Sequence, residues 1–168
     1  MRLLLVALIV ALAGPASAQR YGSTPPRIGA GFDVQSALYG QDVLPDGPSL
    51  GVRIRAALPV NADVSVAASL GLGAHVFEGA DDSAYVLNPQ TSVIVTIPGG
   101  RRSVRYLLGG LGGFLPFSGG GGGASIHAGI GTAIPLSESS VYFELDPSLV
   151  IGSDESVPVI ALRTGVIF

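Results

Sequence analysis

Residues 157–168, VPVIALRTGVIF, give the clearest indication of the fold. Apolar or neutral residues occupy every second position there, ending on Phe168, and the alternate positions carry the single charge, Arg163. An alternation with a period of two indicates a β-strand with two unlike faces. The same alternation recurs along the chain and predicts eight strands. We expect them at residues 27–39, 50–58, 64–76, 89–97, 103–114, 124–134, 141–151 and 157–168.

The first residues have the pattern of a secretion signal. Arg2 precedes an unbroken apolar run at 3–13, and Ala-Ser-Ala at 16–18 has the small-residue pattern of a signal-peptidase site. The apolar run is too short to cross a bilayer as a helix, which takes about 20 residues. We therefore expect a cleaved signal peptide at 1–18, followed by a single domain at 19–168.

Composition excludes several classes of protein. The chain has no Cys, which rules out disulfides, thiolate metal sites and a Cys nucleophile. A net charge of −3 argues against a nucleic-acid partner, because binding nucleic acid requires a basic surface. The mean hydropathy of +0.54 is high for a water-soluble domain, yet the signal region is followed by no apolar run of about 18 residues. Helical membrane spans are therefore excluded, and alternating strands fit best.

The two faces of the predicted strands differ in side-chain size. One face carries large aliphatic residues, and the other carries mostly Gly, Ala and Ser with a few charges. A water-facing surface would carry many more charges, whereas small residues fit the narrow interior of an eight-stranded barrel. We therefore predict an all-β, eight-stranded antiparallel up-and-down barrel whose aliphatic face meets lipid. A soluble exported β-barrel that binds a small apolar ligand is the alternative.

The signal peptide, the eight strands and the ending Arg163-x-Gly165-x-x-Phe168 resemble the small bacterial outer-membrane β-barrel family. That family includes the transmembrane domain of outer-membrane protein A. The resemblance implies a location in the bacterial outer membrane, with lipid and lipopolysaccharide as partners. It also implies that Phe168 is part of a C-terminal signal read by the barrel assembly machinery. We expect a monomer without a cofactor that has a structural or narrow-pore, porin-like role and is not an enzyme.

Seven charged residues fall on the small-residue face of the predicted strands: Asp33, Arg53, Arg55, Arg105, Glu144, Asp146 and Arg163. An unpaired charge inside a narrow lumen is costly, so we expect a network of salt bridges that braces the barrel. A narrow or gated ion path lined by the same groups is the alternative. If the chain reverses at the middle of the connections at 40–48 and 152–156, Asp33 lies opposite Arg55, and Asp146 lies opposite Arg163.

Ser125, His75 and His127 are the remaining candidates for chemistry. The two His residues lack a third ligand and make a poor metal site. Ser125 and His127 leave an outer-membrane lipid hydrolase as a remote alternative, but a catalytic triad also needs an acid beside the His. The nearest acids, Glu144 and Asp146, are expected closer to the other end of the adjacent strand. We therefore predict no catalytic, cofactor or metal site.

Two prolines affect the predicted strands. Proline cannot donate a hydrogen bond to a β-ladder, so Pro89 is expected at the start of its strand. Pro147 falls in mid-strand, where it indicates a local bulge.

Overall fold

The structure is a computed structural model that describes residues 25–38, 48–75, 84–98, 102–117, 122–153 and 155–168. Eight strands follow one another along these residues, each 11 to 14 residues long. They are β1 (Arg27–Ala37), β2 (Pro48–Pro59), β3 (Val64–His75), β4 (Ala84–Ile97), β5 (Val104–Pro116), β6 (Gly123–Pro135), β7 (Ser140–Ile151) and β8 (Ser156–Ile167).

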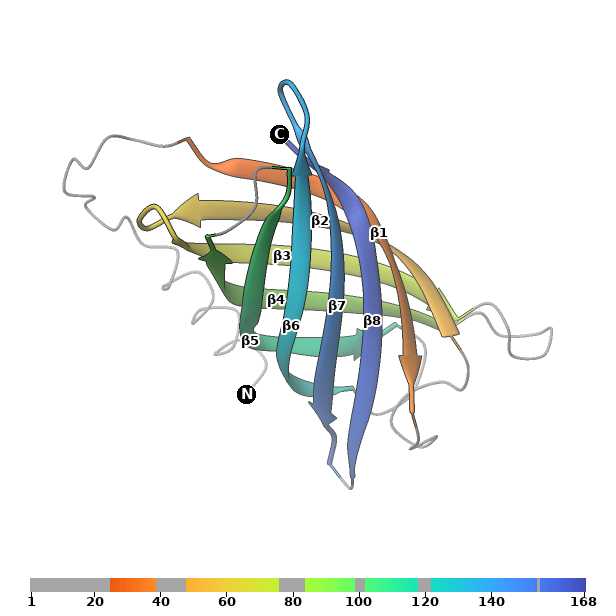
Figure 1. Ribbon diagram of the computed structural model, residues 1–168. Coiled ribbons are helices and arrows are strands. Elements are labelled where there is room, and N and C mark those ends of the chain that lie inside the picture. The colour runs from red at the N-terminus through yellow and green to blue at the C-terminus, as the bar shows by residue number, and fades with distance from the viewer. Residues whose placement is uncertain (1–24, 39–47, 76–83, 99–101, 118–121, 154) are drawn as a thin grey trace.

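The strands close into a barrel (Figure 1). Each strand pairs antiparallel with its neighbours in sequence, and β1 pairs with β8 to complete the ring. At this closure Phe32 stands opposite Thr164, and the backbone N–H of Phe168 donates to the carbonyl of Ile28 at 2.8 Å. A closed sheet has no edge, so it leaves no row of unpaired backbone groups. The predicted up-and-down barrel is confirmed.

The two ends of the barrel are distinguished by their connections. The start of β1 and the end of β8 lie at one end, which we call the terminal end. The connections that follow β1, β3, β5 and β7 lie at the other end, which we call the distal end. At the terminal end Phe168 is 70% exposed, and its backbone is hydrogen-bonded to that of Ile28 on β1.

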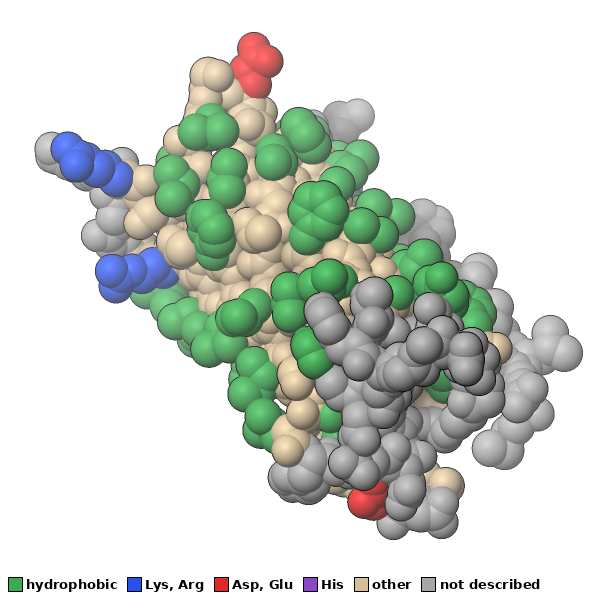
Figure 2. All heavy atoms as spheres, turned by 90° about the vertical axis from the view of Figure 1, so that its right-hand side faces the viewer, with side chains coloured by type: hydrophobic (Ala, Val, Ile, Leu, Met, Phe, Trp, Pro, Cys, Tyr) green, Lys and Arg blue, Asp and Glu red, His purple; other side chains and the backbone are tan. Residues whose placement is uncertain are grey.

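The outside of the barrel is apolar and the inside is polar. Large apolar side chains such as Phe32, Ile54 and Leu162 are more than half exposed, and Figure 2 shows apolar side chains spread over one face of the barrel. Six described charged residues are exposed, each in a connection or within two residues of a strand end: Arg27, Asp63, Arg102, Arg105, Glu138 and Glu155. The other six described charges are buried in the lumen: Asp33, Arg53, Arg55, Glu144, Asp146 and Arg163.

The prediction for the fourth strand is wrong at its beginning. β4 starts at Ala84, five residues before the predicted start at Pro89, and so includes Val86 and Asn88. Both of these side chains are buried in the lumen. Pro89 therefore lies in mid-strand, where a Pro was expected to be excluded.

The two mid-strand prolines, Pro89 and Pro147, are accommodated in the same way. Each pairs on one side, Pro89 with Leu70 and Pro147 with Ile160. On its other side the ladder is interrupted at the proline and resumes in the same register. The predicted bulge at Pro147 is therefore wrong, because an inserted residue would have shifted the register.

The predicted faces of the fifth strand are reversed. Tyr106 and Leu108 point into the lumen, with exposures of 5% and 4%, while Arg105 and Leu107 are exposed. The Tyr106 hydroxyl finds an acceptor inside the barrel, in Glu144 at 2.8 Å. Arg105 is therefore not a lumen residue, and its prediction is wrong.

Some predictions concern residues outside the described ranges. The signal peptide at 1–18 is one of them, and the side chain of His75 is another. Within the described ranges, no helix is long and apolar enough to cross a membrane.

Candidate functional site in the barrel lumen

Arg53 is the centre of a first group of buried polar side chains, the Arg53 cluster. Its guanidinium donates to Asp33 Oδ2 from Nη2 at 3.0 Å and from Nε at 3.3 Å, which forms an ion pair between β2 and β1. Gln35 Nε2 donates to the same carboxylate oxygen at 2.8 Å. The other guanidinium hydrogen bonds go to neutral side chains on β3 and β4, namely Ser69 (3.0 Å), Asn88 (2.5 Å) and Gln90 (3.1 Å).

Glu144 on β7 is the centre of a second group, the Glu144 cluster. Arg55 reaches across the lumen from β2 and meets the carboxylate with two parallel contacts, Nη1 to Oε1 at 2.5 Å and Nη2 to Oε2 at 2.7 Å. Tyr106 on β5 donates its hydroxyl to Oε1 at 2.8 Å. The Arg55 guanidinium also lies 5.4 Å from the ring centroid of Tyr142, close enough for a cation–π interaction.

The Glu144 cluster continues through Arg163 on the closing strand. Arg163 Nη1 forms an ion pair with Asp146 and lies 3.9 Å from Glu144 Oε2. Asp146 Oδ1 is in turn 3.0 Å from His127 Nδ1, and His127 Nε2 is 3.2 Å from Ser92 Oγ. The two clusters together draw side chains from all eight strands.

Positive and negative charges balance in each cluster. The Arg53 cluster pairs one guanidinium with Asp33, and the Glu144 cluster pairs Arg55 and Arg163 with Glu144 and Asp146. These side chains are at most 7% exposed. Removing one partner of a buried ion pair is strongly destabilising, because the other charge is left uncompensated in the lumen. The geometry is therefore that of a brace across the lumen.

Gly71 and Gly131 make room for the side chains of Arg53 and Tyr106. A Cβ on Gly71 would lie 2.6 Å from Arg53 Nη2, and a Cβ on Gly131 would lie 2.6 Å from the Tyr106 hydroxyl and closer still to the ring. Real Cβ atoms do not approach other atoms so closely. Gly71 and Gly131 therefore leave the space that the side chains of Arg53 and Tyr106 occupy.

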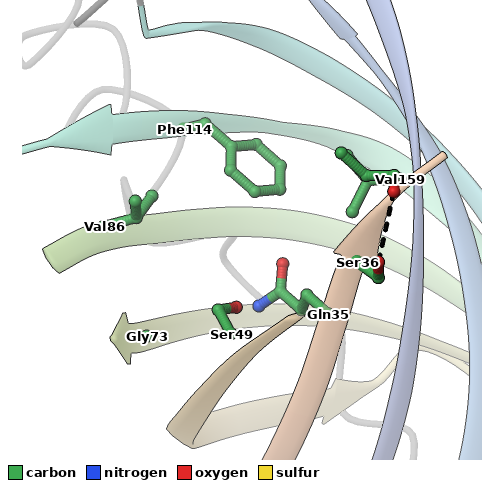
Figure 3. A pocket seen from close by; sticks show the side chains of 8 residues that line it. Gln35, Ser36, Ser49, Gly73, Val86, Phe114 and Val159 are labelled. Carbon is green, nitrogen blue, oxygen red and sulfur yellow. Dashed lines mark hydrogen bonds between the residues drawn. The ribbon is translucent and has the colours of Figure 1, made fainter. Parts of the chain in front are cut away.

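Apolar side chains fill the distal part of the lumen. Val86, Phe114, Val150, Val157 and Val159 pack together there, each no more than 5% exposed, and we call them the distal apolar cluster. Beside this cluster is a hollow of about 10 Å³, which is room for roughly one water molecule. In Figure 3, side chains of the distal apolar cluster and of the polar residues beside it converge on this hollow.

Ser92, His127 and Asp146 are arranged in the order of a catalytic triad. The sequence led us to expect no acid beside His127, and this expectation is wrong, because Asp146 is hydrogen-bonded to it. The serine partner is Ser92, not Ser125, whose buried Oγ has no hydrogen-bond partner among the described residues. A hydrolytic serine must meet its substrate, but Ser92 and His127 are 7% and 4% exposed inside the lumen.

A metal site is not evident in the described part of the chain. None of its groups of His, Asp and Glu side chains brings together three ligands that could hold an ion.

The predicted pairing of the lumen charges is partly correct. Asp146 and Arg163 do form an ion pair, although Arg163 stands opposite Glu144 in the register. Asp33 does not meet Arg55. It stands opposite Gly51, four residues away from the predicted partner, and pairs with Arg53 instead.

Sequence reasoning missed the neutral members of the two clusters. The alternation places Gln35, Ser69, Gln90 and Ser92 on the inward face, but these side chains are uncharged and nothing else in the sequence marks them as partners of the lumen charges. Asn88 lies before the predicted start of the fourth strand, and Tyr106 lies on the strand whose predicted faces are reversed.

Comparison with known proteins shows which solved structures share this fold. No protein-family model and no curated protein matches the chain. Among solved structures, Neisserial surface protein A matches with a TM-score of 0.66 and 13% identity, over 84% of this chain and 94% of that protein. Ail, the attachment invasion locus protein of Yersinia pestis, matches with a TM-score of 0.53 and 16% identity, over 85% of this chain and 97% of Ail.

A third match is the N-terminal β-barrel domain of Pseudomonas aeruginosa OprF, with a TM-score of 0.53 and 14% identity over 87% of this chain and 99% of that domain. These similarities show that the chain has the fold of the eight-stranded outer-membrane β-barrels.

Proposed function

We propose that the protein is an integral outer-membrane barrel with a structural role and a lumen that is closed rather than conducting. The observation that carries this proposal is the distribution of the described charges. Charges inside the barrel are paired in the Arg53 and Glu144 clusters, and charges outside it lie at strand ends or in connections. The outer surface between the two ends of the barrel carries none of the described charges. The hydrocarbon of a membrane requires this, because an Arg at the bilayer midplane costs about 2–4 kcal/mol.

The strand lengths and the backbone pairing also fit a membrane. A transmembrane strand needs about 9–11 residues, and each strand here has at least 11. A soluble barrel that binds an apolar ligand would have its apolar face inward, and here that face points outward. An even number of strands puts both ends of the barrel's strand order at the terminal end. We place this end at the periplasmic side, where it meets the inner leaflet of the outer membrane.

Membrane fractionation tests the location. We expect the exported protein to be released from membranes only by detergent, and to migrate differently on gels before and after heating. Release into the soluble fraction without detergent would contradict the proposal.

The closed lumen leads to a prediction about conductance. In planar bilayers we expect the wild-type barrel to give no resolved conductance steps, because the distal apolar cluster and the two polar clusters fill the lumen. A wide porin in the same bilayer serves as the positive control. Regular steps from the wild-type protein would favour the narrow-pore alternative, and their loss in Arg163→Ala would assign the path to the lumen charges.

We also propose that the Phe168 side chain is read during assembly. Its ring is 70% exposed, so the Phe168→Ala barrel should unfold in vitro with a free energy within about 0.5 kcal/mol of the wild type. In cells we expect less of this variant to reach the heat-modifiable form in the membrane fraction. Phe117→Ala is the matched control, since that ring is 65% exposed at the distal end. Equal assembly of both variants would contradict the proposed signal.

A further inference from the structure

Arg105 is the one described charge that lies within a strand and faces outward. It is the second residue of β5, next to the buried Tyr106, and its own side chain is exposed. Arg27 is the first residue of β1, but it has the inward parity of Gly29 and stands opposite Ala57. Arg105 therefore differs from the other charges at the terminal end, because it projects from the membrane-facing surface.

The neighbours of Arg105 on this outer face are known from the register. Ile97 on β4 stands opposite it on one side, and Thr132 on β6 stands opposite it on the other. Directly opposite residues have Cβ atoms about 5 Å apart, so the Thr132 hydroxyl is within reach of a group bound by the guanidinium. Leu107, two residues further along β5, is 49% exposed on the same face.

A second guanidinium lies three residues before Arg105. Arg102 is exposed in the connection that leads into β5. Neither arginine forms an ion pair with a described residue, including the acids nearest this end, Asp63 and Glu138. Figure 2 shows arginine side chains projecting at the margin of the apolar surface. Among the described residues, Arg102 and Arg105 are thus two cations without an ion-pair partner at the terminal end.

The ligand that fits this arrangement is an anionic phosphate. The planar guanidinium can make two parallel hydrogen bonds to phosphate oxygens, and a hydroxyl can donate a third. We propose that Arg105, Arg102 and Thr132 bind the phosphate of an anionic phospholipid in the leaflet at the terminal end, with an acyl chain lying along Leu107. This inference rests on the proposed membrane location, which decides that the bound phosphate belongs to a lipid.

Photolabelling in vesicles tests this site. The full chain is folded into phosphatidylcholine vesicles that contain a minor fraction of either phosphatidylglycerol or phosphatidylcholine with a photoreactive acyl chain. After illumination, labelled peptides from β4 to β6 are quantified by mass spectrometry. We expect the wild type to be labelled more by phosphatidylglycerol than by phosphatidylcholine. Arg105→Gln should lower this preference about fivefold, since each arginine near an anionic surface contributes about 1 kcal/mol.

Three further measurements distinguish a lipid site from a general effect of charge and from a site for free phosphate. Arg27→Gln removes the same charge at the same end but from an inward position, and should leave the preference unchanged. Arg105→Lys keeps the charge without the planar fork, and should retain only part of the preference. Replacing chloride by inorganic phosphate at equal ionic strength should have little effect, because a free phosphate has no acyl chain to hold it beside Leu107.

Gel mobility of the unheated samples distinguishes failure of this inference from failure of the proposed function. If the variants fold and insert but Arg105→Gln keeps the wild-type preference, the lipid site is overturned and the membrane barrel stands. Loss of the preference in inorganic phosphate would mean a site for free anions and would also overturn the lipid site. If the wild-type chain does not insert into the vesicles, the proposed function fails, and the lipid site fails with it.

Discussion

Replacing Glu144 with Gln is expected to lower the free energy of unfolding by about 3–5 kcal/mol. The Glu144 carboxylate is buried and meets Arg55 with two contacts, and it also accepts a hydrogen bond from Tyr106. A neutral amide leaves the Arg55 cation in the lumen without a counterion. Arg163 would also lose a negative charge that lies 3.9 Å away.

Urea unfolding of the barrel in lipid vesicles measures this effect. The chain has no Trp, so unfolding is followed by far-ultraviolet circular dichroism and by the mobility of unheated samples on gels. Glu138→Gln, in the exposed connection between β6 and β7, is the matched control and should change stability by less than about 0.5 kcal/mol. Similar losses for the two variants would mean that the Glu144 cluster does not brace the barrel.

A double variant isolates the ion pair itself. Combining Glu144→Gln with Arg55→Met removes the cation that the first change leaves unpaired. We therefore expect the double variant to lose less stability than the sum of the two single variants. Strict additivity would indicate that Arg55 and Glu144 do not interact across the lumen.

Adding one methyl group at Gly131 is expected to cost about 1–3 kcal/mol, the range found for overpacked interiors. The new Cβ of Gly131→Ala would overlap the ring of Tyr106, so the ring must move and give up its hydrogen bond to Glu144. The same urea unfolding experiment measures the loss of stability. Gly109→Ala is the matched control on β5, where the nearest atom to the new Cβ is 3.4 Å away, and should be tolerated.

The role of Tyr106 in this effect can be tested directly. In a Tyr106→Ala background the added methyl group has space, so Gly131→Ala should cost much less there than in the wild type. A coupling between the two sites of about 0.5–3 kcal/mol is expected for residues in direct contact. If the cost is unchanged in that background, the steric conflict lies with another part of the lumen.

The strands and most of their faces follow from the sequence because their signal is local. Period-two alternation is read within a few residues, and seven of the eight predicted strands begin within two residues of the observed start. The exceptions also have local causes. The predicted fourth strand begins too late because a Pro is expected at a strand boundary, and the predicted faces of the fifth strand are reversed because Gly109, Gly110, Gly112 and Gly113 blur the alternation.

The apolar outer surface and the set of buried charges also follow from the sequence. Six of the seven charges predicted in the lumen lie there. Alternate residues of a strand point to opposite faces, so the alternation of the neighbouring residues indicates on which face a charge lies. Arg105 is the exception, and it lies on the strand whose faces were reversed.

Which charges form pairs depends on the register of the strands and on closure of the barrel. A slip of two or four residues between paired strands keeps every side chain on its own face, so alternation does not distinguish one such register from another. For this reason Asp33 could be placed opposite Arg55, whereas the barrel pairs it with Arg53. The contact between Arg55 and Glu144 joins β2 to β7, which are not neighbours in the sheet, so only closure of the barrel brings it about.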